Sequence, residues 1–134
     1  MPRHFTPDEA NAELHEIRPL VEELVKHRRE QQRIQSKRVE LAAKIAGNGG
    51  GIEAQELGAL EEAEQRERVE IARRVNDIHG RGAIVKDLDA GLVDFPALRE
   101  GEEILLCWHL GEDEVAHWHG LEEGFAGRKR LDPE

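Results

Sequence analysis

The chain has little of what an oxidised, membrane-bound or large-cored protein needs. It holds one cysteine, Cys107, so an internal disulfide is excluded and a reducing cytoplasm fits best. Only 4% of its 134 residues are aromatic, whereas 36% are charged, a composition closer to long solvated helices than to a large core. No apolar run approaches the ~18 residues of a membrane span, and the N-terminus carries no apolar signal segment. We therefore expect a cytoplasmic protein with no membrane partner.

Charge and serine content narrow the function classes further. The formal net charge of -10 opposes any general affinity for nucleic acid, so no such partner is expected. Ser36 is the one serine and falls within a predicted helix, which leaves no Ser/His/Asp constellation. The glycine-rich stretches at residues 47–51 and 80–82 lack the Lys-Ser/Thr of a phosphate-binding loop.

Two helices are predicted, over about residues 7–46 and 53–79. Thr6, Pro7 and Glu9 give the first helix a capping box and a proline at its first position. Four glycines between residues 47 and 51 end this helix, and Gly80 suits the end of the second. Apolar residues recur at helical spacing in both helices: Leu14, Ile17, Val21, Leu24, Ile34, Leu41 and Ile45 in the first, and Leu57, Leu60, Ile71, Val75 and Ile78 in the second.

Helices joined by so short a loop pack antiparallel, which predicts a helical hairpin over residues 1–80. Folding the chain at Gly49 places the mostly basic residues 26–38 beside the mostly acidic residues 61–70. Opposite charges at matching heights favour this register, although each exposed pair contributes only ~0.2–1 kcal/mol. The middle of the seam is poor in apolar residues, so we expect an oligomeric partner or the rest of the chain to stiffen the hairpin.

From Gly82 onwards the apolar pattern becomes that of short strands. Residues 84–88, 92–95, 104–110 and 115–119 are strand candidates separated by turn residues, and residues 125–131 suit an edge strand. The predicted fold is therefore α+β, with a long antiparallel α-helical hairpin followed by a small, mostly antiparallel β domain over residues 82–134.

Several segments resemble the bacterial domain-of-unknown-function 2203 family. They span nearly the whole chain and are most specific in its second half: residues 5–11, 85–97, 106–112, 118–119 and 124–128. The resemblance implies no activity, because none is assigned to that family.

The segment richest in chemistry is the strand pair that turns at about residue 111. Cys107, His109, His117 and His119 are four metal-ligand side chains within thirteen residues. A three-residue turn places all four on one face and the apolar residues of both strands on the other, whereas a two-residue turn splits the apolar set. Burial favours the first register, and the four side chains would then suit zinc or iron. The alternative is the polar outer face of a half-exposed sheet, with Cys107 as a small buried hydrophobe.

Three functions follow from these patterns. The first is a non-enzymatic interaction or assembly module, in which the hairpin binds a protein partner or a second copy of the chain. The second is a metal-binding protein that uses the Cys/His cluster, with a metal-dependent hydrolase as its catalytic form. The third is an acid/base enzyme that uses Asp87, Asp89, Asp94 and Glu112, although aspartates between short strands are more often turn formers. No catalytic residue is assigned, and an enzyme is the less favoured interpretation.

Overall fold

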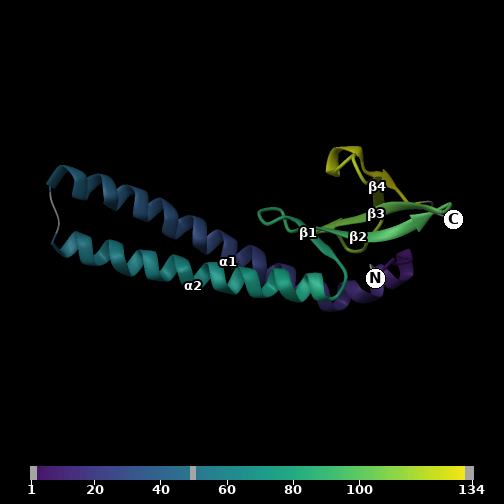
Figure 1. The fold of residues 1–134 in the computed structure, drawn as a ribbon, viewed down its shortest axis with the longest axis horizontal. Coiled ribbons are helices and arrows are strands. Elements are labelled where there is room, and N and C mark those ends of the chain that lie inside the picture. Colours follow the sequence, from purple (N-terminus) through teal and green to yellow (C-terminus); the bar gives the residue numbers. More distant parts are fainter. Residues whose placement is uncertain (1–2, 49–50, 132–134) are drawn as a thin grey trace.

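The computed structural model of the chain describes residues 3–48 and 51–131. Two long helices come first, α1 (Pro7–Asn48) and α2 (Ile52–Gly80). Five strands follow: β1 (Ile84–Asp87), β2 (Leu92–Arg99), β3 (Glu102–His109), β4 (His117–Gly120) and β5 (Lys129–Arg130), with a 3₁₀ turn at Phe125–Gly127 before the last. Figure 1 shows the two helices side by side, projecting away from the sheet. The predicted α+β fold is confirmed.

Local signals set the start of α1. Thr6 and Glu9 form the expected capping box: the Glu9 N–H donates to Thr6 Oγ1 at 3.1 Å, and the Thr6 N–H donates to Glu9 Oε1 at 2.9 Å. Pro19 lies inside the helix without ending it. Both helices match their predicted bounds to within two residues, and residues 49 and 50 of the predicted glycine turn lie outside the described residues.

The hairpin is held by apolar layers with an ionic layer between them. Ile34 and Leu41 of α1 and Ile71 of α2 are buried. Among them Glu64, only 2% exposed, accepts hydrogen bonds from Arg38 of the opposite helix and from Arg68 of its own helix. This contact is the expected pairing of the basic stretch of α1 with the acidic stretch of α2. Neither helix, over the residues that the structure describes, is long and apolar enough to cross a membrane.

Two arginines compensate the buried charge of Glu64. Arg38 donates from α1, and Arg68 donates from one turn further along α2 at 3.0 Å. Burial opposes ionisation, but these hydrogen bonds and positive charges lower the pKa of Glu64 below its ordinary value. The carboxylate therefore stays charged inside the helix pair. Its hydrogen bond with Arg38 fixes the axial position of α1 relative to α2.

The sheet is an antiparallel meander in the order β1-β2-β3-β4-β5. On the central strand, Cys107 lies opposite Asp94 of β2 and opposite His117 of β4. Pro96 of β2 lies beyond the last residue that pairs with β1, so its missing N–H costs no ladder bond. Its carbonyl instead accepts the Phe5 N–H at 2.7 Å, which ties the start of the chain to the sheet.

The inner face of the sheet packs on the first half of α1, which lies beneath it in Figure 1. This core joins Phe5, Ala10, Leu14, Ile17, Val21, Leu24 and Val25 to Val93, Phe95, Ala97, Ile104, Leu106 and Trp108. Phe5 and Phe95 meet edge to face, with ring centroids 5.3 Å apart. Because successive strand side chains alternate, the residues between these apolar positions point to the outer face.

The β3–β4 register is the one that burial predicted, with Cys107 opposite His117. The connection between β3 and β4 is longer than the predicted three-residue turn, because strand pairing ends at Cys107 and His117. Asn11 of α1 takes up both backbone groups of Val115, accepting from its N–H at 2.7 Å and donating to its carbonyl at 3.3 Å. The carbonyl of Ala116 accepts the Leu131 N–H at 2.8 Å. The Asn11 contacts replace the β3–β4 ladder bonds that a tight turn would have made, whereas the Ala116–Leu131 bond continues the register of β4 with β5.

We expect the ionic layer to specify the helix register more than it stabilises the fold. Arg38→Met leaves Glu64 buried with one arginine fewer, and should lower the free energy of unfolding by about 1–3 kcal/mol. The double variant Arg38→Met/Glu64→Leu removes both charges and should regain wild-type stability or exceed it. Urea unfolding followed by circular dichroism measures both. A double variant less stable than the single one would contradict this expectation.

Candidate metal centre

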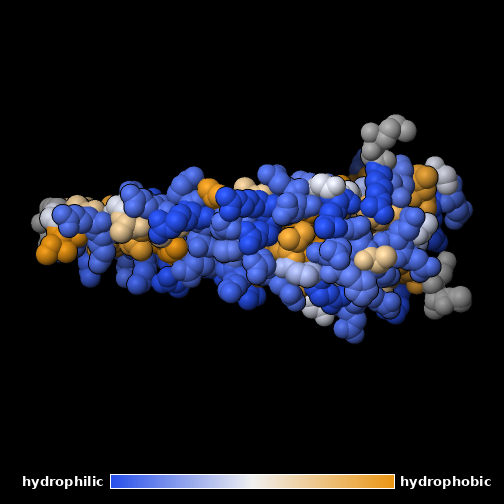
Figure 2. Space-filling model, turned by 90° about the horizontal axis from the view of Figure 1, so that it is seen from below, coloured by the Kyte–Doolittle hydropathy of each residue, from blue (hydrophilic) through white to orange (hydrophobic). Residues whose placement is uncertain are grey.

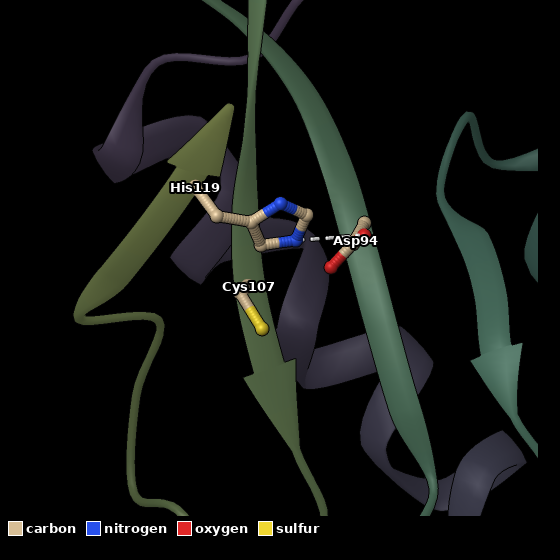
Figure 3. Close-up of side chains that lie close together, drawn as sticks. All are labelled: Asp94, Cys107 and His119. Atoms are coloured by element: carbon tan, nitrogen blue, oxygen red, sulfur yellow. Dashed lines mark hydrogen bonds and ion pairs between the residues drawn. The ribbon is translucent and has the colours of Figure 1, made fainter. Parts of the chain in front are cut away.

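Three buried side chains meet on the outer face of the sheet, one from each of three neighbouring strands. Asp94 comes from β2, Cys107 from β3 and His119 from β4 (Figure 3). One donor atom of each lies within 4.8 Å of those of the other two, and none of the three residues is more than 2% exposed. Over residues 3–48 and 51–131, no other group of three such donors is so close. Cys107 and His119 were predicted as metal ligands, whereas Asp94 was predicted only as an acid/base candidate.

The alternation of apolar residues explains why these side chains point outward. Val93 and Phe95 enter the core, so Asp94 between them faces the other way. Cys107 lies in the same way between two core residues of β3. The direct pairing of Asp94 with Cys107 across the strands then brings their Cβ atoms to about 4.5–5.5 Å. Apolar packing on the inner face therefore sets the donor positions on the outer face.

The hydrogen bonds of His119 fix its tautomer. Its Nδ1 lies 2.8 Å from the carbonyl oxygen of Gly120, and a carbonyl oxygen can only accept, so Nδ1 carries the proton. Nε2 lies 3.1 Å from Asp94 Oδ2. Without a metal, one proton must lie between Nε2 and Oδ2. With a metal, Nε2 has a lone pair to offer, because the other nitrogen is already held by the backbone.

The Asp94 carboxylate is only partly hydrogen-bonded. Its Oδ1 is buried and has no hydrogen-bond partner among the described residues. Burial raises the pKa of Asp94, and the neighbouring His119 opposes that shift. A buried carboxylate oxygen without a donor costs free energy, so a missing partner is expected at this position.

The thiol of Cys107 is unreactive in this environment. Burial, with the negative charge of Asp94 added, raises the pKa of the Cys107 thiol to about 12. A thiol of that pKa is not a nucleophile at neutral pH, because the thiolate is the reactive form. The three side chains are therefore not a cysteine–histidine–aspartate nucleophilic triad. A metal ion changes this chemistry, because a coordinated thiol loses its proton.

The donor set suits a tetrahedral transition-metal ion. Sulfur, imidazole nitrogen and carboxylate oxygen are all accepted by Zn²⁺. With zinc–ligand distances of about 2.0–2.3 Å, neighbouring donors in a tetrahedral site lie roughly 3.3–3.8 Å apart. The 3.1 Å between His119 Nε2 and Asp94 Oδ2 is close to that range. Since no donor pair exceeds 4.8 Å, closing around an ion requires side-chain movements of roughly 1 Å.

The other two predicted ligands gather around a different carboxylate. His109 Nε2 and His117 Nδ1 each lie 3.7 Å from Glu112 Oε2. Both imidazoles are on the outer face, as predicted, and they adjoin the Asp94–Cys107–His119 set without entering it. Arg128 donates to Glu112 Oε1 at 2.9 Å. Burial opposes ionisation of Glu112, but the hydrogen bond and charge of Arg128 keep its pKa below the ordinary value.

The remaining acidic candidates, Asp87 and Asp89, have partners of their own. Asp87 Oδ1 accepts the backbone N–H groups of Asp89 and Ala90 at 2.8 and 3.2 Å, so it is the turn former that the sequence suggested. Asp89 Oδ1 accepts from Arg28 of α1 at 2.9 Å. These contacts occupy the two aspartates in the β1–β2 turn and in its docking to α1.

The chain belongs to the family described as "Uncharacterized conserved protein (DUF2203)", whose model matches residues 3–131. The resemblance noted from the sequence is thereby confirmed, and it covers nearly the whole chain. No curated protein and no solved structure matches the chain. The family description names no activity, so the function is argued from the site.

We expect Cys107 to be unreactive in the folded, metal-free protein. It is fully buried and its pKa is raised to about 12, so at pH 8 its reaction with a disulfide reagent such as dithionitrobenzoate should be at least about a hundredfold slower than that of a free thiol. The same protein unfolded in urea serves as the control and should react at once. Fast, complete modification of the native chain would show that the site is open.

Proposed function

We propose that this member of the DUF2203 family is a metal-binding protein whose centre, formed by Asp94, Cys107 and His119, holds a divalent transition-metal ion, preferentially Zn²⁺. The single observation that carries the proposal is the buried Oδ1 of Asp94, which has no partner among the described residues and lies beside a thiol and an imidazole. Sulfur and nitrogen donors favour zinc or iron over magnesium or calcium.

Ion binding would exchange protons for a metal. The proton of the Cys107 thiol and the proton between Asp94 and His119 would both be released, because thiolate, carboxylate and neutral imidazole are the forms that bind a metal. The ion would join β2, β3 and β4 through one ligand from each strand. Three protein ligands leave one position of a tetrahedral ion to water or another group. All three ligands are buried, so a substrate has little access to that position, and the ion would mainly hold the sheet together.

Metal content and stability test this proposal. The purified protein should contain about one zinc per chain, and zinc at a hundredfold excess over its Kd should stabilise the fold by about 2.7 kcal/mol. Cys107→Ser and Asp94→Asn, which change shape little, should abolish that stabilisation. His15→Ala, at an exposed histidine on α1, is the matched control and should leave it intact. Thermal unfolding with and without a chelator measures the effect. Melting temperatures that ignore both zinc and chelator would refute the proposal.

A second candidate function, self-association through the hairpin, is favoured by apolar residues left uncovered near its free end. Val39 is 67% exposed and Ile52 is 80% exposed, and Figure 2 shows hydrophobic surface at that end of a mostly hydrophilic helix pair. Isolated exposed apolar residues are common, but two such residues on a projecting element suit a partner.

Charge distribution favours a second copy of this chain as that partner. Residues 26–44 hold seven basic and two acidic side chains, whereas residues 53–70 hold seven acidic and two basic ones. A two-fold arrangement that lays α1 of one copy along α2 of the other brings opposite charges together twice. The same contact would cover Val39 and Ile52.

Light scattering on the eluting protein tests the hairpin dimer. We expect a mass twice the 15.2 kDa of the chain, falling towards the monomer in Val39→Glu/Ile52→Glu and at high salt. Leu98→Glu, at a residue of the sheet that is 57% exposed, is the matched control and should remain dimeric. A monomer at every concentration would exclude self-association.

A further inference from the structure

We infer that residues 121–128, the segment between β4 and β5, form a lid whose opening controls how metal ions enter and leave the centre. The inference rests on the proposed metal-binding function and adds a route of access to it. The three donors lie on the outer face of the sheet, yet none is more than 2% exposed, so other residues cover them there. α1 covers the inner face, whereas Figure 1 shows the segment after β4, in yellow, on the side of the sheet away from α1.

The lid is attached to the sheet beside two of the three ligands. At its end, Arg128 Nη2 donates to the carbonyl oxygen of Cys107 at 3.4 Å. Near its beginning, Glu123 Oε1 accepts the N–H of Gly120, the residue that follows His119, at 2.6 Å. Movement of this segment away from the sheet would therefore uncover the centre from the Cys107 and His119 sides.

Apolar packing contributes little to holding the lid closed. All of residues 121–128 are described by the structure, and none of them is buried. Phe125, 46% exposed, meets His109 edge to face with ring centroids 5.8 Å apart. A cavity of about 230 Å³ between Phe125 and Leu92 leaves the packing incomplete. Segments with so few buried apolar contacts open at a lower free energy than the whole fold.

The ion pair of Arg128 with Glu112 is the latch of this lid. Arg128 Nη2 donates to Glu112 Oε1 at 2.9 Å, and the two side chains are only 14% and 21% exposed. A charged hydrogen bond shielded in this way is stronger than an exposed ion pair. Glu112 itself is fixed, because its carbonyl oxygen accepts the Trp108 Nε1–H at 2.9 Å. The latch thus joins the lid to a part of the sheet that is held in place.

Contacts within the lid allow it to move as one unit. The Gly127 N–H donates to the Gly124 carbonyl oxygen at 3.1 Å, and Lys129 Nζ donates to Glu123 Oε1 at 2.7 Å. Gly124 has a φ of 69°, a conformation that glycine adopts at no steric cost. Opening therefore breaks the Arg128–Glu112 pair and keeps the internal contacts.

The rate at which Cys107 reacts in the metal-free chain tests the lid. Arg128→Met keeps the length of the side chain and removes the ion pair, so modification by dithionitrobenzoate at pH 8 should become at least about tenfold faster than in wild type. Burial raises the pKa of Cys107, whereas the charge of Arg128 lowers it, so a loss of charge alone would slow the reaction. Arg130→Met, at an exposed arginine of β5, is the matched control and should react like wild type.

The urea dependence of this rate separates lid opening from loss of global stability. Opening the lid exposes little surface, so the modification rate should rise only slightly at low urea concentrations. A variant that is merely less stable would instead react with the steep urea dependence of complete unfolding. An unchanged or slower rate in Arg128→Met, or a rate that follows global unfolding, overturns the lid.

Zinc exchange provides the second readout. Arg128 is not a ligand of the ion, so Arg128→Met should accelerate both zinc binding and zinc release to a chelator while the Kd changes little. A changed Kd with unchanged rates of exchange would also overturn the lid. If the wild-type chain binds no zinc, the proposed function fails, and the thiol rates of the metal-free protein still decide whether residues 121–128 open.

Discussion

The pairing of β3 with both of its neighbours determines which side chains meet in this protein. Trp108 and Phe95 are buried on the inner face, and burying each large apolar side chain contributes about 1.5–3 kcal/mol. A slip of one residue would turn Trp108 outward and Cys107 inward. The hydrophobic effect therefore assembles the donors, which gain their positions from the residues beside them in the sequence. No attraction between the donors themselves is needed.

Because apolar packing positions the donors, the sequence could predict those contacts that follow from the apolar pattern of neighbouring strands. The helix bounds follow from local signals, such as the capping box of Thr6 and Glu9, and the β3–β4 register follows from apolar alternation on adjacent strands. Asp94 was not placed with Cys107 because that contact depends on how β2 pairs with β3, across a separate turn. The signal was present, since Asp94 lies between two residues that are both apolar and both buried. Carrying the alternation of β3 over to β2 would have found it.

Such patterns could not predict which residues Glu112 contacts. It lies in a connection that has no period, and its side chain is oriented by Arg128, sixteen residues further along the chain. The connection is long because α1 takes up the backbone of Val115 through Asn11. These are tertiary contacts between irregular segments, which strand and helix periodicities do not encode. The hairpin gives the opposite case, because the charge blocks of its two helices were sufficient to predict their register.

Both ends of the described chain are tied to the sheet, the first through Phe5 and Pro96 and the last through Leu131 and Ala116. Relative to the sheet, the outer hairpin is therefore an insertion whose length is not constrained by either anchor. Ile34 and Leu41, like Glu64 and Ile71, are seven residues apart and buried. Shortening or extending both helices by seven residues keeps the same positions facing each other and changes the reach by about 10.5 Å. One sheet can thus carry arms of several lengths.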